Sequence, residues 1–328
     1  MILITGGAGF IGSNVVAALA KRGERIVVCD SFGTSEKWRN IAKHEIAELI
    51  SPAQCLEWLS RRHDRVRGIV HLGAISATTE PNIDALADNN VRFTLALWDF
   101  CTAFDKPFIY ASSAATYGDG SKGFDDDGRP EALSKLVPLN GYAWSKHLVD
   151  RSIARRVAAG EPAPSQWVGL KFFNVYGPNE YHKGAMRSVL VQLHAQAKST
   201  GVLRLFKSNL PDYPDGEQLR DFIYVRDCAQ AILWLLDHPK VSGLFNLGSG
   251  TARSFLDVAK ALMAAMPRRK LSVEFFDMPD GLKASYQNKT LAEMGRLKAA
   301  GYNQPFTSLE DGVKDYVKNY LEKPDPYL

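Results

Sequence analysis

Short, nearly continuous apolar runs recur along the first part of the chain, and longer amphipathic stretches separate them. Four of the runs are expected to form strands, at residues 2–5, 25–30, 68–72 and 108–112. Their β-branched, apolar composition is typical of strands that are buried on both faces. The stretches at residues 14–21, 52–62 and 85–104 predict helices. This alternation predicts an α/β fold with a Rossmann-like, doubly wound parallel sheet and right-handed crossovers.

The first strand and the first helix are joined by the glycine-rich segment TGGAGFIG, residues 5–12. Its glycines match a dinucleotide fingerprint as Gly7, Gly9 and Gly12 or, with a looser spacing, as Gly6, Gly9 and Gly12. Glycine permits the tight turn and lets a pyrophosphate approach the backbone, where the new helix presents unpaired N–H groups. The second strand ends in Asp30, at the distance expected for a residue that binds a ribose diol. The segment therefore predicts a dinucleotide site.

The loop after Asp30 carries signals for both nicotinamide dinucleotides. Asp30 favours a free 2′-hydroxyl, whereas a nearby Lys37 or Arg39 can hold a 2′-phosphate. Both cofactors, NAD and NADP, stay open at this point.

The second half of the chain continues the alternation with further strands and helices. Strands are expected at residues 167–173, 203–208, 220–225 and 243–247, and helices at residues 186–197, 228–236 and 254–266. The 243–247 strand is expected to return to the main sheet. We therefore expect two domains. The dinucleotide-binding domain covers residues 1–173 with 222–248 returning to it, and the smaller α/β C-terminal substrate domain covers residues 174–221 and 249–328.

Chemistry-bearing residues follow the expected strands at their carboxyl ends, where ligands of open α/β sheets bind. On the helix after residue 140, Tyr142 and Lys146 are four apart and share a face. We expect both to point toward the cofactor, with Ser113 binding the same reacting oxygen. A nearby ammonium favours the phenolate, so Lys146 is expected to lower the pKa of Tyr142 and make it a usable base.

Composition narrows the possible partners. The 328 residues are 45% hydrophobic, and 40 basic against 36 acidic residues leave a net charge of +4. This near balance gives no reason to expect nucleic-acid binding. No apolar run reaches the roughly 18 residues of a membrane span, so no membrane partner is expected. The four cysteines lack metal-binding spacing, and neither a signal peptide nor a metal is expected, which favours a cytoplasmic protein with reduced thiols.

The glycine motif, Ser113 and the Tyr142/Lys146 pair resemble the extended short-chain dehydrogenase/reductase superfamily, whose members often act on nucleotide sugars. The segment NVYGP at residues 174–178 continues that resemblance, and HKG at residues 182–184 narrows it. Together with TTE at 78–80, DNN at 88–90 and RDF at 220–222, these segments resemble the ADP-glyceromanno-heptose 6-epimerase family over nearly the whole chain.

The resemblance implies an isomerase that inverts C6″ of an ADP-linked heptose for the lipopolysaccharide core, with tightly held NADP and a homo-oligomeric state. It implies that Tyr142 and Lys183 are two acid/base residues, one for each face of the sugar carbon. The expected cofactor contacts are Gly6, Gly9, Phe10, Ile11, Gly12, Asp30, Ser31, Lys37, Leu72, Gly73, Ala74, Ile75, Ser76, Asn89, Lys146, Val175 and Lys183. The expected substrate contacts are Ser113, Asn174, Ala185, Gln192, Phe206, Lys207, Ser208, Asn209, Arg220 and Tyr286.

Several positions depart from the family pattern. A lysine that some relatives carry for the 2′-phosphate aligns with Pro52, which leaves Lys37 as the main support for NADP. Ala185 and Gln192 stand where relatives have a serine and a histidine in the sugar pocket. The alternatives are another nucleotide-sugar epimerase of the superfamily or a non-catalytic dinucleotide-binding protein. A dehydratase is disfavoured, because no Asp-Glu pair follows Thr116.

Overall fold

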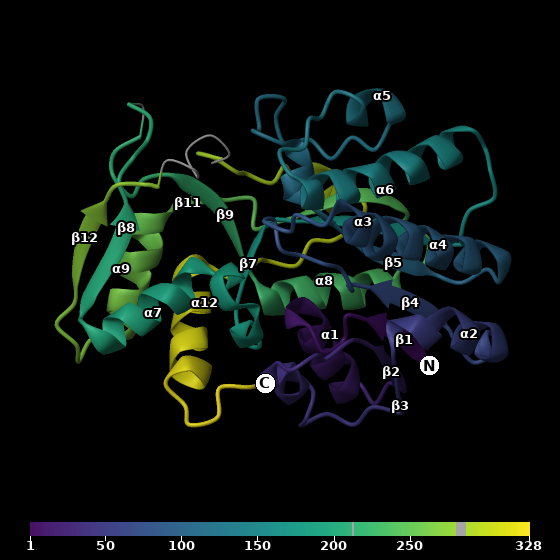
Figure 1. Cartoon of the computed structure of the whole chain (residues 1–328), viewed down its shortest axis with the longest axis horizontal. Helices are drawn as coiled ribbons and strands as arrows, with labels where there is room; N and C mark the ends of the chain where they lie inside the picture. Colours follow the sequence, from purple (N-terminus) through teal and green to yellow (C-terminus); the bar gives the residue numbers. More distant parts are fainter. Residues whose placement is uncertain (212, 280–286) are drawn as a thin grey trace.

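The computed structural model describes residues 1–211, 213–279 and 287–328 of the chain. Within these residues, a seven-stranded parallel sheet forms the larger part of the molecule, with the strand order β10-β6-β5-β4-β1-β2-β3 (Figure 1). Its strands are β1 (Ile2–Thr5), β2 (Ile26–Cys29), β3 (Glu48–Ile50), β4 (Gly68–His71), β5 (Phe108–Ser113), β6 (Trp167–Phe172) and β10 (Gly243–Leu247). The order reverses between β1 and β4, which creates a crevice at the carboxyl ends of these strands.

The sheet confirms the predicted doubly wound parallel fold. Every strand predicted in the first half is present within one or two residues, and β10 pairs with β6, so the 243–247 segment does return to the main sheet. β3 was not predicted. It has only three residues, and its central Leu49 is 53% exposed, so it lacks the continuous apolar run that identified the others.

Helices cover both faces of this sheet. α1 (Phe10–Lys21) and α8 (Val225–Asp237) pack against one face, in the core cluster that contains Ile4 and Val28. α2 (Pro52–Arg62), α4 (Phe93–Ala103) and α6 (Gly141–Ala158) pack against the other, in the cluster that contains Leu3 and Val27. Successive residues of β1 and β2 therefore alternate between two apolar layers, as strands buried on both faces require.

The single helix predicted for residues 85–104 is interrupted. The chain forms α3 (Ile83–Leu86), then a π-helical segment, η2 (Ala87–Arg92), and then α4. Such π segments frequently occur at functional sites, because the extra residue re-aims neighbouring side chains. Here the segment contains Asn89 and Asn90, and both lie next to the crevice described below.

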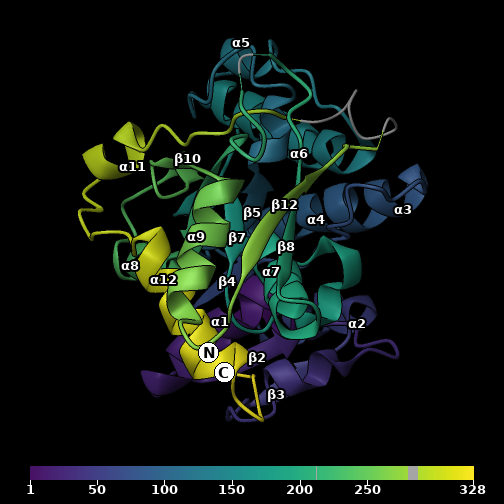
Figure 2. The same cartoon turned by 90° about the vertical axis from the view of Figure 1, so that its left-hand side faces the viewer.

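A smaller lobe lies at one end of the main sheet (Figures 1 and 2). It is formed by elements from the second half of the chain. Its strands form a three-stranded sheet of order β11-β9-β7 and a parallel pair of β12 and β8. Its main elements are β7 (Asn174–Tyr176), α7 (Val189–Ser199), β8 (Val202–Phe206), β9 (Leu219–Tyr224), β11 (Ala252–Ser254), α9 (Phe255–Ala265), β12 (Ser272–Phe276), α12 (Leu309–Tyr316) and η5 (Val317–Leu321). A second core fills it, and Phe10 at the start of α1 belongs to that core. The lobe is therefore packed directly onto the glycine segment.

The remaining short elements connect these layers. They are η1 (Glu36–Asn40), η3 (Ala114–Tyr117), α5 (Pro130–Leu133), η4 (Tyr181–Met186) and α11 (Gly295–Ala299). α11 lies between β12 and α12 of the smaller lobe in sequence but packs beside β10, and its Leu297 belongs to the core under the main sheet.

Candidate active site

A cavity of about 700 Å³ lies at the carboxyl ends of the central strands. All the residues predicted to bind the cofactor line it: Gly6, Gly9, Phe10, Ile11, Gly12, Asp30, Ser31, Lys37, Leu72, Gly73, Ala74, Ile75, Ser76, Asn89, Lys146, Val175 and Lys183. The four predicted catalytic residues, Ser113, Tyr142, Lys146 and Lys183, line the same cavity. Residues from widely separated segments of the chain thus converge on one space that can hold an elongated molecule.

The glycine segment adopts the Gly6, Gly9 and Gly12 reading of the fingerprint. Gly6 has a φ of +66°, and a Cβ there would lie 2.6 Å from the Gly73 nitrogen. A Cβ on Gly12 would lie 2.1 Å from the Gly6 carbonyl oxygen. Gly9 is the N-cap of α1 and offers no capping side chain, so the N–H groups of the first helical turn face the cavity. This surface fits the pyrophosphate of a dinucleotide.

Asp30 and Lys37 form an ion pair at the end of β2. Lys37 Nζ lies 2.5 Å from Asp30 Oδ1 and donates to the Ser31 carbonyl at 3.1 Å. The same carboxylate accepts hydrogen bonds from the backbone N–H groups of Ala8 at 2.8 Å and Ser31 at 2.7 Å. The position expected to bind a ribose therefore presents an acidic and a basic group side by side.

Tyr142 and Lys146 lie on the first turns of α6, which Asn140 caps by accepting from the Ala143 N–H at 2.9 Å. Ser113 ends β5 beside them. Lys146 Nζ donates to the Ala111 carbonyl at 2.8 Å, and burial lowers the pKa of Lys146 to about 8. The ammonium is thus held against β5, on the cavity wall.

The expectation that Lys146 lowers the pKa of Tyr142 is wrong for this structure. Burial raises the pKa of Tyr142, a hydrogen bond with Ser113 opposes that rise, and the Asp150 carboxylate adds to it. Lys146 is not among the groups that shift this pKa, and its ammonium is bonded to the Ala111 carbonyl of β5. Tyr142 is therefore held as a neutral phenol that can donate a proton to an oxygen bound at Ser113.

Lys183 reaches the cavity from η4, on the side of the smaller lobe. Its ammonium lies 5.4 Å from the centre of the Phe10 ring. Burial lowers the pKa of Lys183, and the Glu180 carboxylate partly offsets this. A lysine with a depressed pKa can exchange a proton near neutral pH. The cavity thus has two proton-transfer groups, Tyr142 and Lys183, on different elements.

A hydrogen-bond chain that the sequence did not reveal supports the β4 end of the cavity. Thr94 Oγ1 donates to the Asn90 carbonyl at 2.6 Å, so it must accept from His71 Nε2 at 2.8 Å. His71 Nδ1 then accepts from Thr5 Oγ1 at 2.6 Å, and Thr5 Oγ1 accepts from the Gly73 N–H at 3.1 Å. Burial lowers the pKa of His71 to about 3, so the ring is neutral and its role is to hold the strand ends.

Asn90 is a second residue that sequence reasoning missed. Its side chain accepts from the Ile75 N–H and donates to the Ile75 carbonyl, both at 2.9 Å, and also donates to Ser145 Oγ at 3.0 Å. It therefore fixes the 72–76 segment of the cavity to α6. The available signal was an asparagine pair within an otherwise apolar helical stretch. His182 also lines the cavity, and its Nδ1 lies 3.2 Å from Asn40 Nδ2.

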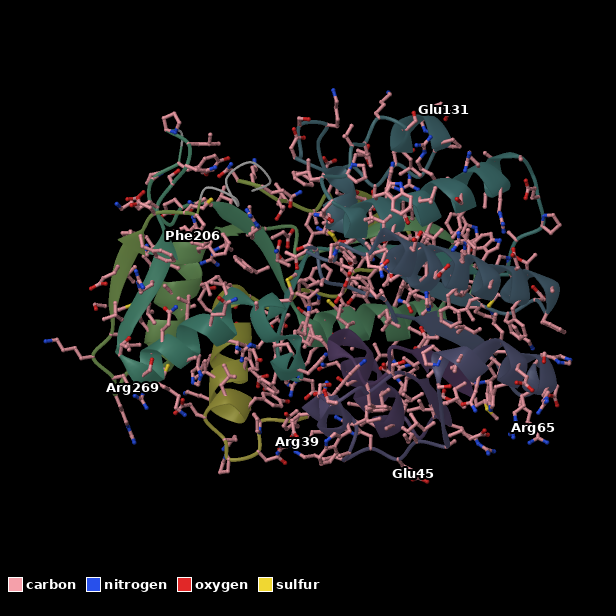
Figure 3. All side chains as sticks on the ribbon, in the orientation of Figure 1. Arg39, Glu45, Arg65, Glu131, Phe206 and Arg269 are labelled. Carbon is pink, nitrogen blue, oxygen red and sulfur yellow. The ribbon has the colours of Figure 1, made fainter. Side chains whose placement is uncertain are left out.

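Among the described residues, the predicted substrate contacts other than Ser113 do not line this cavity. Asn174 accepts from Thr290 Oγ1 at 3.2 Å, and Gln192 on α7 donates to the Arg187 carbonyl at 3.0 Å. Arg220 in β9 lies 5.4 Å from the Phe255 ring. The others lie on the smaller lobe or on the exposed turn that carries Lys183: Ala185, Phe206, Lys207, Ser208 and Asn209 (Phe206 is labelled in Figure 3). Tyr286 lies outside the described residues.

Two features are absent from the described part of the chain. Among those residues, no group of three or more His, Cys, Asp or Glu side chains is arranged to hold a metal ion. Over the same residues, every helix is too short or too polar to cross a bilayer.

Comparisons with known proteins agree with this architecture. The model of the NAD dependent epimerase/dehydratase family matches residues 2–248. The ADP-L-glycero-D-manno-heptose-6-epimerase of Nitratidesulfovibrio vulgaris is 47% identical over 100% of both chains. The protein of the same name from Fusobacterium nucleatum is 44% identical, also over 100% of both chains.

Solved structures are similar over nearly the whole chain. The crystal structure of Helicobacter pylori ADP-L-glycero-D-manno-heptose-6-epimerase has a TM-score of 0.80 and 29% sequence identity, and covers 97% of this chain and 95% of its own. A dTDP-glucose 4,6-dehydratase from Bacillus anthracis in complex with NAD has a TM-score of 0.76 at 22% identity, covering 99% and 98%. The second likeness concerns the fold alone.

Proposed function

The chain belongs to the NAD dependent epimerase/dehydratase family, and within it we propose that the protein is an isomerase that inverts C6″ of ADP-D-glycero-D-manno-heptose. The observation that carries this proposal is the placement of Tyr142 and Lys183, from two different elements, in one cavity with the whole dinucleotide-binding set. The full-length identity to heptose epimerases supports the choice of sugar. The product supplies the heptose that is built into the lipopolysaccharide core.

The chemistry of the substrate requires a redox route. C6 of the sugar carries a hydroxyl but no neighbouring group that would acidify its hydrogen, so direct deprotonation is unfavourable. A nicotinamide dinucleotide supplies a reversible hydride acceptor, which removes the stereocentre by taking C6 to a ketone and restores it on either face. The residues of the chain then have to bind the sugar oxygen, transfer its proton and allow both faces to react.

Two proton-transfer groups suit this requirement, because one fixed group cannot reach both orientations of the C6 hydroxyl. Lys183, whose lowered pKa favours the neutral amine, accepts the hydroxyl proton in one orientation as C6 is oxidised. Tyr142, held as a phenol beside Ser113, donates a proton to the oxygen in the other orientation as C6 is reduced again. Ser113 orients the sugar oxygen. Lys146 keeps its positive charge beside β5 by donating to the Ala111 carbonyl.

For the cofactor we propose NADP, with NAD as the alternative. Lys37 supports NADP, since its ammonium stands where a 2′-phosphate would need a cation and already neutralises Asp30. The residues that would hold the dinucleotide are those of the glycine segment, Asp30, Ser31 and Lys37. Denaturing the purified protein and identifying the released nucleotide by mass spectrometry distinguishes the two. A purely NAD content would overturn the NADP assignment.

We further propose that the protein acts as a cytoplasmic homo-oligomer, as the family resemblance implies. All four cysteines are unpaired and buried, which agrees with a reducing compartment. Light scattering on the eluted protein measures the subunit number, and a mass equal to one 36.3 kDa chain would contradict the oligomeric state.

The test of the reaction uses the protein as purified, with no added cofactor. ADP-D-glycero-D-manno-heptose is incubated with it, and the ratio of the C6″ epimers is followed by NMR. Approach to a mixture of both epimers is expected and would show that the hydride cycles on a retained nicotinamide. No change, even after NADP and then NAD are supplied, rules out the heptose assignment and directs the search to other nucleotide sugars.

A further inference from the structure

A charged pair that the proposed reaction does not use is buried behind the active site. Lys171 Nζ in β6 lies 2.8 Å from Asp150 Oδ2 in α6, and both side chains are 0% exposed. The pair lies in the layer between the main sheet and α6, where it does not line the cavity itself but contacts Ser112, which does.

The pair is hydrogen-bonded to two further elements, β5 and η3. Asp150 accepts from Ser112 Oγ at 2.6 Å and from Tyr110 OH at 3.1 Å, both in β5. Lys171 donates to Thr116 Oγ1 in η3 at 2.6 Å. The two charges thus join α6, β5, β6 and η3 through a network in which each polar group has a partner.

These anchored positions are the neighbours of the catalytic residues. Asp150 lies one helical turn beyond Lys146 and two turns beyond Tyr142 on the same face of α6. Lys171 lies opposite Ser112 in the register of β5 and β6, and Ser112 precedes Ser113. The network therefore sets the distance between the helix that carries Tyr142 and Lys146 and the strand that carries Ser113.

Stability does not account for such a pair. Removing two charges from water is costly, and well-packed neutral replacements of buried ion pairs are often as stable or more stable. We propose that Asp150 and Lys171 are positioning residues of the active site, which hold α6 against β5 and place a negative charge behind the Lys146 ammonium. This inference rests on the proposed function for the roles of Tyr142, Lys146 and Ser113.

The second part of the proposal, a negative charge behind the Lys146 ammonium, can be measured as a change in the pKa of Lys146. Asp150 is the acidic group that faces Lys146 from α6, and it opposes the lowering of the Lys146 pKa by burial. Lys171, the cationic partner of Asp150 in β6, is not among the groups that shift this pKa, so the loss of its charge leaves the expected direction unchanged. His71, which faces it from β4, is neutral, and Tyr142 stands one turn away as a phenol. Removing the Asp150 charge should therefore lower the pKa of Lys146 further, and the ammonium would be lost at lower pH.

The test is the double substitution Asp150→Asn with Lys171→Gln. The amide pair can keep the hydrogen bonds to Ser112, Tyr110 and Thr116 while both charges disappear. We expect a folded protein with the urea midpoint of the wild type, normal dinucleotide content and a kcat about tenfold lower. We also expect the alkaline limb of the kcat profile to move to lower pH, because Lys146 deprotonates earlier. A wild-type kcat with an unmoved limb would overturn the proposal.

Two controls separate the possible failures. Tyr110→Phe removes one hydrogen bond to the same carboxylate but keeps both charges, so its alkaline limb should stay in place. The pKa of Lys146 can also be followed directly by NMR of labelled lysine side chains, without any substrate. If the wild type epimerises nothing, this titration still tests the charge effect, and an unchanged Lys146 pKa in the double variant refutes it. The titration is also the decisive readout if the double variant is less stable than expected.

Discussion

At the scale of single residues, different side chains of the site have different tasks. Tyr142 and Lys183 transfer protons, whereas Lys146 holds a positive charge at the cavity wall. Tyr142 is kept as a phenol by burial, and Lys146 is bonded to the backbone of β5 rather than to the phenol. Lys183 approaches from the opposite side on a turn of its own, next to the Phe10 ring. This separation requires each of Tyr142 and Lys183 to be essential for exchange between the two epimers, because each serves one orientation of the hydroxyl.

Lys183→Met and Tyr142→Phe test this requirement directly. Each removes a proton-transfer group while keeping most of the side-chain volume, so each should cut the epimerisation rate by about a hundredfold or more. Fold and dinucleotide content, measured by circular dichroism and by nucleotide release, should stay at wild-type levels. Epimerisation by Lys183→Met at the wild-type rate would show that a second base is not needed.

Some of the residues at the site could be predicted from the sequence and others could not. Gly6, Asp30, Tyr142 and Lys183 stand in spaced motifs whose chemistry is local to the chain. Asn90 acts only through partners distant in sequence, Ile75 and Ser145, so no spacing identifies it. The direction of the Tyr142 pKa shift was missed for the same reason, since it depends on burial and on the Ser113 and Asp150 side chains.

At the scale of elements, periodicity predicted the long elements well and the short ones poorly. α2 begins and ends at the residues expected, because a proline opens it and its apolar positions are regular. β3, β7, β11 and β12 have three to five residues each, too few for a pattern. The π segment η2 preserves helical composition, so its register change leaves no trace in the sequence.

Helix α9, which supports the smaller lobe, offers a prediction at this scale. Ser254 Oγ accepts from the Asp257 N–H at 3.0 Å, and Asp257 Oδ2 accepts from the Ser254 N–H at 3.1 Å, which forms a capping box. Ser254→Ala removes the first bond and should lower the free energy of unfolding by about 1 kcal/mol. Urea denaturation measures the change. The control is Ser51→Ala at the more exposed start of α2, where a smaller loss is expected, and equal losses would contradict the role of burial.

At the scale of the whole molecule, residues 325–328 connect two neighbouring segments beside the cavity, and we refer to them as the strap. Tyr181 OH donates to the Pro326 carbonyl at 2.8 Å, and the Leu328 N–H donates to Asn179 Oδ1 at 3.0 Å. Tyr181 and Asn179 both lie in the segment that precedes Lys183. On the other side, Lys43 Nζ donates to the Tyr327 carbonyl at 2.8 Å, in the segment that follows Lys37. The strap thus joins the segment that precedes Lys183 to the segment that follows Lys37 at the ribose site.

Deleting residues 325–328 should therefore affect both stability and cofactor retention. Three hydrogen bonds and the packing of Tyr327, which is 9% exposed, would be lost, so the free energy of unfolding should fall by roughly 2–3 kcal/mol. The purified variant should also retain less dinucleotide, because, among the described residues, only the direct contacts of Asn40 with Asn179 and His182 would then join the two segments. Lys43→Met is the matched control, since it breaks an exposed ion pair with Asp325 and one of the bonds, and should lose only about 1 kcal/mol. If the deletion variant unfolds at the wild-type urea midpoint and has full dinucleotide content, the strap does not stabilise the contact between these two segments.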